Sequence, residues 1–301
     1  MANQDSFAPN SFQNIKARSI LVWGLISLPV LILISFLLAR IARLTHINPK
    51  DPIFELIISF IWVYGLIVSW TWRQFNHFKI NLRRIIGTVP PNHRWLPTIG
   101  LMICVLVLSL GSFYFVYYFV SFIAPSYVKS ILNSKVFSLD SKTSVPILYN
   151  TLTVITLVVV APVTEELLFR GILLHRWTVK WGVRRAVLIS SLVFAVLHGN
   201  IVGLFIFGLV MAVLYIKTGT LLVPIACHAL NNGFVAVMAL IAMNQGSAKT
   251  VHTIEQFRAN VWAGLVFIAL SAPWVIRFLY KNWPSQGWQA PYFTASRSEQ
   301  E

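Results

Sequence analysis

The amino-acid sequence predicts an all-α fold, a polytopic membrane bundle of about eight transmembrane helices. Of its 301 residues, 57% are hydrophobic and only 11% are charged, whereas soluble domains carry roughly 25% charged residues. The hydrophobic residues gather in runs that approach the roughly 20 residues needed to cross the hydrocarbon core. No polar stretch between these runs is long enough to fold as a soluble domain, so we expect the chain to lie in the lipid bilayer.

Eight apolar runs are expected to form the bundle. They lie at residues 19–39, 53–72, 97–124, 147–168, 185–199, 201–216, 219–243 and 260–280. The first is longer than the core of a signal peptide, which has about 7–15 residues, so we expect it to be retained. We divide the chain into an N-terminal region of three spans (1–146), a core of four spans that carries the candidate catalytic residues (147–243), and a last span with a disordered cytoplasmic tail (244–301).

The basic residues predict the orientation of the bundle. The net charge of +15 comes from Lys and Arg residues between the apolar runs, with no run of five, so a nucleic-acid partner is not expected. Counted by side, these residues are about twice as frequent where both termini lie, which places both termini in the cytoplasm. Cys104 and Cys227 fall inside apolar runs and are expected to behave as small hydrophobic residues.

Two adjacent acidic residues, Glu165 and Glu166, lie within the fourth apolar region. An ionisable side chain inside the membrane costs about 2.5–3.5 kcal/mol on insertion scales, which makes it a functional candidate. Glu166 and Arg170 have the i, i+4 spacing of a helical ion pair, whereas Glu165 points about 100° away. Glu165 is therefore free to act as a general base, although a structural salt bridge with a spare carboxylate explains this pattern equally well.

Further polar residues interrupt two other spans. His198 lies four residues after Phe194, and Asn232 lies one turn after His228 on the same helix face. A lone histidine in an apolar helix is usually a hydrogen-bonded core residue. Two of them, together with an acid pair and an arginine, indicate a shared site across three spans.

The predicted depths of these residues agree. Glu165, His228 and His198 lie 11, 11 and 13 residues from basic residues at the cytoplasmic edge. These edge residues are Arg176, Lys217 and Arg185, respectively. The corresponding depths are about 16, 16 and 20 Å if the helices continue to those edges.

Small residues and prolines predict close packing and bending near the site. Gly199-x-x-x-Gly203 and Gly208-x-x-x-Ala212 allow close approach of helices. Pro162 can bend its helix just ahead of the acid pair.

These residues resemble the three motifs of the CPBP family (CAAX protease and bacteriocin-processing, also called Abi), a family of intramembrane peptidases. The motifs read Glu165-Glu166-x-x-x-Arg170-Gly171, Phe194-x-x-x-His198 and His228-x-x-x-Asn232. The resemblance covers about residues 150–243. It implies an all-helical bundle that cleaves peptide bonds near the cytoplasmic side of the membrane.

The resemblance also implies roles for individual residues. Glu165 activates a water with help from His198, while His228 and Asn232 stabilise the oxyanion and Glu166 and Arg170 support the site. The expected reaction needs no cofactor. A Zn²⁺ ion held by Glu165, His198 and His228 is the alternative, although the His-Glu-x-x-His pairing of many zinc peptidases is lacking.

The expected partners are the lipid bilayer and a peptide or protein substrate, either a lipidated CAAX tail or a leader peptide. The main alternative is a non-catalytic membrane scaffold or chaperone with the same fold. A proton-coupled transporter is disfavoured because the ionisable residues form one cluster and the sequence shows no repeated halves.

Overall fold

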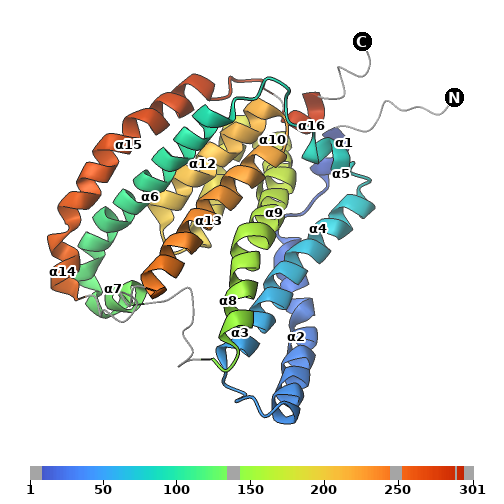
Figure 1. Cartoon of the computed structure of the whole chain (residues 1–301). Coiled ribbons are helices and arrows are strands. Elements are labelled where there is room, and N and C mark those ends of the chain that lie inside the picture. Colours follow the sequence, from blue (N-terminus) through green and yellow to red (C-terminus); the bar gives the residue numbers. More distant parts are fainter. Residues whose placement is uncertain (1–8, 134–142, 245–252, 289, 295–301) are drawn as a thin grey trace.

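The computed structural model describes residues 9–133, 143–244, 253–288 and 290–294. Within these residues the fold is all-helical, without strands, as predicted (Figure 1). Seven stretches of helix are long and apolar enough to cross a membrane. They span Ser19–Leu44, Pro52–His77, Trp95–Ile123, Pro146–Trp181, Ile201–Thr218, Leu222–Ala242 and Ile254–Asn282. The chain is thus an integral, multi-pass membrane protein.

The fifth predicted run forms α11 (Val183–Val196), which is shorter than the other spans. Its 14 residues extend about 21 Å, less than the ~30 Å hydrocarbon core. α11 follows Gly182, whose φ of 81° turns the chain back after α10 (Leu174–Trp181). The predicted run is therefore helical and packs against its neighbours, but it is too short to cross the whole hydrocarbon core.

The helices form two adjoining groups. α6 (Trp95–Ile123), α12 (Ile201–Thr218), α13 (Leu222–Asn244) and α15 (Val261–Asn282) stand together on the left of Figure 1. On the right lie α2 (Ser19–Leu44), α4 (Gly65–His77) and the long helix that starts with α8 (Pro146–Ile155). α13 packs against that long helix and so joins the groups.

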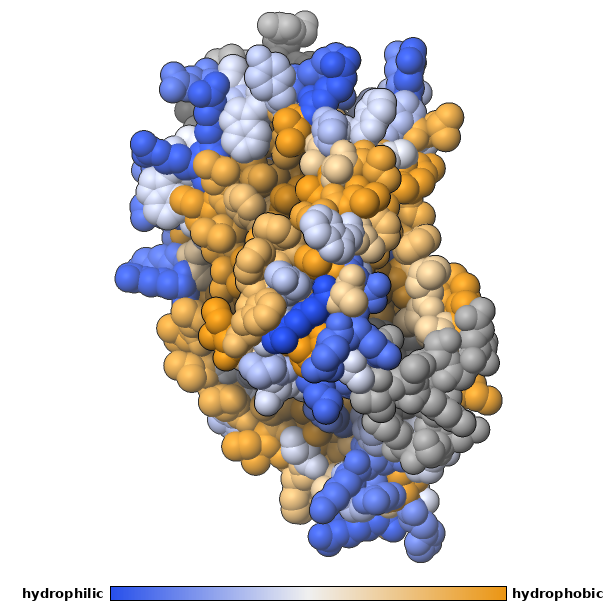
Figure 2. Space-filling view, turned by 90° about the vertical axis from the view of Figure 1, so that its left-hand side faces the viewer, coloured by the Kyte–Doolittle hydropathy of each residue, from blue (hydrophilic) through white to orange (hydrophobic). Residues whose placement is uncertain are grey.

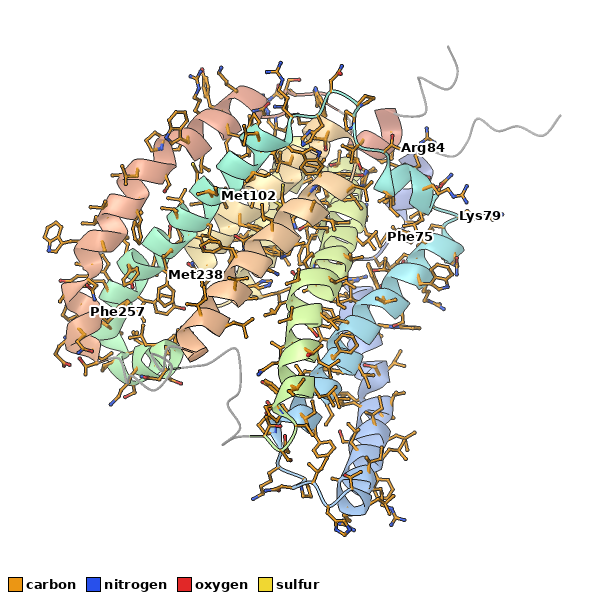
Figure 3. The ribbon with its side chains drawn as sticks, viewed as in Figure 1. Phe75, Lys79, Arg84, Met102, Met238 and Phe257 are labelled. Carbon is orange, nitrogen blue, oxygen red and sulfur yellow. The ribbon has the colours of Figure 1, made fainter. Side chains whose placement is uncertain are left out.

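The two ends of the described chain lie at one end of the bundle (Figure 1). Lys79 and Arg84 mark this end in Figure 3, and Phe257 marks the opposite end of the left-hand group. Figure 2 shows hydrophobic surface between hydrophilic residues on the face that includes α15. Trp262, Leu270 and Trp274 of α15 are more than half exposed, as expected of side chains that face lipid.

Close helix contacts occur at two glycines. A Cβ at Gly208 would lie 2.9 Å from the Cβ of Ser191, so α12 and α11 could not pack this closely with a larger residue. A Cβ at Gly264 would lie 2.5 Å from the Cβ of Tyr114, which fixes the contact of α15 with α6. The packing predicted at Gly208 is therefore confirmed.

The expectation of a disordered tail does not hold for Pro291–Thr294, which form the short helix α16. Tyr292 is only 3% exposed and its ring packs edge-on against Phe12 of α1 (Pro9–Gln13). The polar composition of the tail does not reveal that Tyr292 is buried, because the segment that covers it lies at the other end of the sequence. Residues 295–301 of the predicted tail lie outside the described part of the chain.

Candidate functional site

The acid pair lies between two π-helical segments of one continuous helix, from Pro146 to Trp181. α8 leads into η2 (Thr156–Val160), α9 (Ala161–Glu166), η3 (Leu167–Leu173) and α10. A π segment bonds each carbonyl five residues ahead and rotates the side chains that follow, and such segments are frequent at functional sites. Glu165 and Glu166 end α9, directly before η3.

Glu166 is held by two buried partners. Arg170 Nη1 donates to Glu166 Oε1 at 2.8 Å, which confirms the predicted ion pair, and both side chains are almost fully buried. Arg170 Nη2 also donates to the Gly208 carbonyl oxygen at 2.9 Å, which ties the helix to α12. The Nδ1 atom of His228 lies 2.9 Å from the same Glu166 oxygen. Glu166 and Arg170 together therefore link three helices, and Arg170 balances the charge of Glu166.

The carboxylate of Glu165 has different surroundings. Its Oε2 atom is buried without a hydrogen-bond partner among the described residues. It lies 3.8 Å from His198 Nε2 and 3.9 Å from His228 Nε2. These distances exceed a direct hydrogen bond. The structure thus brings Glu165 and both predicted histidines together around one carboxylate oxygen.

Both histidines present the same ring atom to Glu165. His198 Nδ1 lies 2.7 Å from the Phe194 carbonyl oxygen, and His228 Nδ1 faces Glu166. A carbonyl or carboxylate oxygen only accepts, so each Nδ1 must carry the hydrogen. Nε2 of each neutral ring is then free to accept a proton from the side of Glu165.

Aromatic rings fix the orientations of the charged side chains. Phe194 stacks on His198 with ring centroids 4.5 Å apart, and Phe207 meets His228 edge-on at 5.0 Å. The Arg170 guanidinium lies 5.1 Å from the centre of the Phe194 ring. Such contacts with an uncharged ring restrict the rotamers of the charged side chains.

Asn232 lies in the site but its amide has a bonding partner. Its Nδ2 atom donates to the Leu157 carbonyl oxygen at 2.9 Å. In the π register of η2 this carbonyl would pair with residue 162, which is a proline and has no N–H. Asn232 therefore replaces the backbone donor that Pro162 lacks, and only its second amide hydrogen is available for a substrate. Asn231 donates to the Asn232 Oδ1 atom at 3.3 Å.

The sequence did not single out His175, which is fully buried at the start of α10. Its Nδ1 donates to the Arg170 carbonyl oxygen at 3.0 Å, and its Nε2 accepts from the Tyr292 N–H at 3.3 Å. His175 thereby supports the segment that carries Arg170. Its position in a run of basic residues looks like a loop, so no signal in the sequence marks it as buried.

The possible metal ligands form a loose group. Among the described residues, no group of three or more His, Cys, Asp and Glu side chains has the arrangement of a metal site. Zinc ligands lie about 2.0–2.2 Å from the ion, and the 3.8 and 3.9 Å separations at Glu165 would have to contract to share one. Cys227 is buried in the apolar core.

Comparisons with known proteins extend the resemblance. Residues 147–234 match the family model described as type II CAAX prenyl endopeptidase Rce1-like. An "Uncharacterized 24.3 kDa protein" of Escherichia coli is 36% identical over 85 residues, which cover 26% of this chain and 39% of that protein. The "Putative membrane peptidase YdiL" of Bacillus subtilis (strain 168) is 35% identical over 85 residues, or 27% of this chain and 35% of that protein.

The matched region therefore spans well under half the length of these two relatives. Residues 147–234, which match the family model, contain the acid pair, both histidines and Asn232. No solved structure is significantly similar to the chain.

Proposed function

We propose that this chain, whose residues 147–234 match the Rce1-like family model of type II CAAX prenyl endopeptidases, is an intramembrane endopeptidase. One observation carries the proposal: two histidine Nε2 atoms converge within 4 Å of the buried Oε2 of Glu165. A carboxylate and two imidazoles that share one oxygen can hold a water and move its protons. A purely structural salt bridge does not require this convergence.

Glu165 acts as the general base. It removes a proton from a water positioned with the help of His198, and the water oxygen attacks the carbonyl carbon of the substrate peptide. The C–N bond of the resulting tetrahedral intermediate then breaks, and Glu165 returns the proton to the departing amine. Water adds across the bond, so atoms and charge balance without a further reactant.

His228 and Asn232 stabilise the negative oxygen of the intermediate. To donate from Nε2, His228 must also carry a hydrogen there, because its Nδ1 hydrogen faces Glu166. Asn232 contributes its second amide hydrogen, while the first bonds the Leu157 carbonyl. Arg170 keeps Glu166 in place.

The proposed mechanism uses no metal ion. In the alternative, Glu165, His198 and His228 would hold Zn²⁺, which would activate the water as a Lewis acid, and the contact of His228 with Glu166 would suit a ligand-orienting role. Measuring the metal content of the active protein distinguishes the metal-free mechanism from the zinc-dependent one.

The substrate is proposed to be a membrane-associated peptide or protein, either a lipidated CAAX tail or a leader peptide. Cleavage is proposed near the cytoplasmic side, with both termini in the cytoplasm. Two observations support this orientation: the described chain ends lie at one end of the bundle, and basic residues are about twice as frequent on that side.

The test is the Glu165→Gln variant, assayed for cleavage of a reporter peptide in the membrane. Loss of the general base is expected to lower the rate by about 10²–10⁴-fold, while the protein stays folded. Glu55→Gln is the matched control, because Glu55 is an exposed acid of another span and should retain full activity. Unaltered cleavage by Glu165→Gln would contradict the mechanism, and no cleavage by the unmodified protein of any CAAX or leader reporter would favour a scaffold.

A further inference from the structure

A cavity of about 810 Å³ lies apart from the candidate active site. It is lined by the segment before α6, the start of α6, the end of α12 and the end of α15, at the end of the bundle where the ends of the described chain lie. Met102 marks the adjoining part of α6 in Figure 3. None of the six candidate site residues lines this cavity.

Four cations line the cavity and no described acidic residue does. They are Arg94, Lys217, Arg277 and Lys281. Among the described residues, all ion pairs within 4 Å involve Glu165 or Glu166. None of the four cavity cations therefore has an acidic partner within the described part of the chain. Four positive charges that converge without a counter-charge repel one another, and an anion in the cavity would relieve the repulsion.

Polar residues share the cation end of the cavity, namely Asn92, His93, Thr98, Thr218 and Asn282. Farther along α6 the lining is apolar. Leu101 and Cys104 of α6 lie 7 and 10 residues beyond Arg94, which corresponds to about 10 and 15 Å along the helix. Leu214 and Phe278 form the facing wall. A ligand that fits this cavity has an anionic head and a hydrocarbon chain. A free anion would leave the apolar wall uncovered.

We propose that the cavity binds one anionic phospholipid, with its phosphate among the four cations and an acyl chain along the apolar wall. Basic pockets between membrane helices are suited to such headgroups. The Lys217 ammonium lies 5.7 Å from the centre of the Phe278 ring, which holds it over the cavity wall. The bound lipid would bridge α6, α12 and α15 and stabilise their contact. This site is independent of the proposed peptidase reaction.

The test follows thermal unfolding of the full-length protein in neutral detergent by tryptophan fluorescence. Phosphatidylglycerol is expected to raise Tm by a few degrees, whereas phosphatidylcholine with the same chains and inorganic phosphate should not. Native mass spectrometry should show one retained phosphatidylglycerol. An equal Tm shift with phosphatidylcholine would show that the headgroup charge is not required. An equal Tm shift with inorganic phosphate would show that the site binds a free anion and needs no acyl chain.

Two variants of matched design test the location. Arg277→Gln with Lys281→Gln should abolish the phosphatidylglycerol shift, whereas Arg83→Gln with Lys180→Gln, which removes two exposed charges outside the cavity lining, should keep it. If both double variants keep the shift, or both lose it, the lipid does not bind here.

A cavity-filling variant leaves the charges unchanged. Gly100 lines the cavity and a Cβ there has open space, so Gly100→Leu should fold and block the acyl chain. Gly65 has equally open space elsewhere, so Gly65→Leu is its control. The proposal requires loss of the shift in Gly100→Leu alone, and a retained shift in that variant would exclude an acyl chain from this cavity.

Discussion

At the scale of single residues, Glu165 and Glu166 are neighbours in sequence with different surroundings. Glu166 is fully buried and contacts Arg170 and His228 through one oxygen. Glu165 is 14% exposed and has only distant contacts with two imidazoles. The helix directs the two side chains about 100° apart, so Glu166 is held by close partners and Glu165 is not.

The Glu166–Arg170 pair predicts a specific pattern of stability. Arg170→Met should destabilise the protein by about 3–5 kcal/mol, because it leaves the buried Glu166 charge without a partner. Adding Glu166→Gln should restore much of that loss, since two neutral side chains need no compensation. Cleavage should remain low in the double variant, because Glu166 also holds His228.

Equilibrium unfolding of the two single variants and the double variant measures this coupling. Arg83→Met serves as a control for the loss of an exposed arginine and should be close to neutral. Additive effects of the two substitutions would show that the pair is not energetically coupled.

At the scale of helices, the sequence predicts those features that depend on the residues of a single segment. Long apolar runs mark the spans, and the i, i+4 spacing marks the Glu166–Arg170 pair. The motifs indicate which helices meet, because polar residues in three apolar spans suggest a shared site, and His198 and His228 do both lie near Glu165. These features can be predicted because they depend on neighbouring residues or on which residue types occur.

The features that the sequence did not predict depend on register and on distant contacts. A π segment changes one hydrogen-bond step while the apolar pattern continues, so η2 and η3 are invisible in composition. The pairing of Asn232 with the Leu157 carbonyl follows only once that register is known. The burial of His175 and Tyr292 depends on chain ends that meet in space, more than 100 residues apart in sequence.

The loop between the first two spans is fastened to the segment before α8 by one carboxylate. Asp51 caps α3 (Pro52–Ser59) by accepting from the Ile53 N–H at 3.1 Å. It also accepts from the Thr143 hydroxyl at 2.6 Å and from the N–H and hydroxyl of Ser144 at 2.7 and 2.6 Å. Burial raises the pKa of Asp51, but these hydrogen bonds outweigh it and lower the pKa to about 2.

This contact predicts a pH dependence of stability. The pKa of Asp51 is lower in the folded protein than its ordinary value of about 3.9, so the ionised carboxylate stabilises the fold above that value. The contribution should be lost as the pH falls from about 4 to about 2. Asp51→Asn can still cap α3 but cannot titrate. Thermal unfolding across this range should show a smaller loss in Asp51→Asn than in the unmodified protein, and identical pH profiles would contradict the assignment.

At the scale of the whole molecule, both chain ends pack on the helix that carries the acid pair. Phe12 stacks on His175 with ring centroids 4.9 Å apart, and Tyr292 meets the same imidazole edge-on at 6.0 Å. The Arg176 guanidinium also donates to the Ile15 carbonyl oxygen at 2.5 Å. The N- and C-terminal segments thus close one end of the bundle around His175, which itself bonds the Arg170 carbonyl.

Tyr292 should therefore hold the C-terminal segment through its ring more than through its hydroxyl. The ring contacts Phe12 and His175 and is 3% exposed, whereas the hydroxyl only accepts from the Asn81 N–H at 3.3 Å. Tyr292→Ala should cost about 3–5 kcal/mol, as for other buried aromatic residues, and should open the tail to proteases. Tyr292→Phe keeps the ring and should lose about 1 kcal/mol with the tail still protected. Unfolding in detergent and limited proteolysis from the C-terminus measure both effects, and equal cleavage of the two variants would show that the tail is held by its backbone bond to His175 alone.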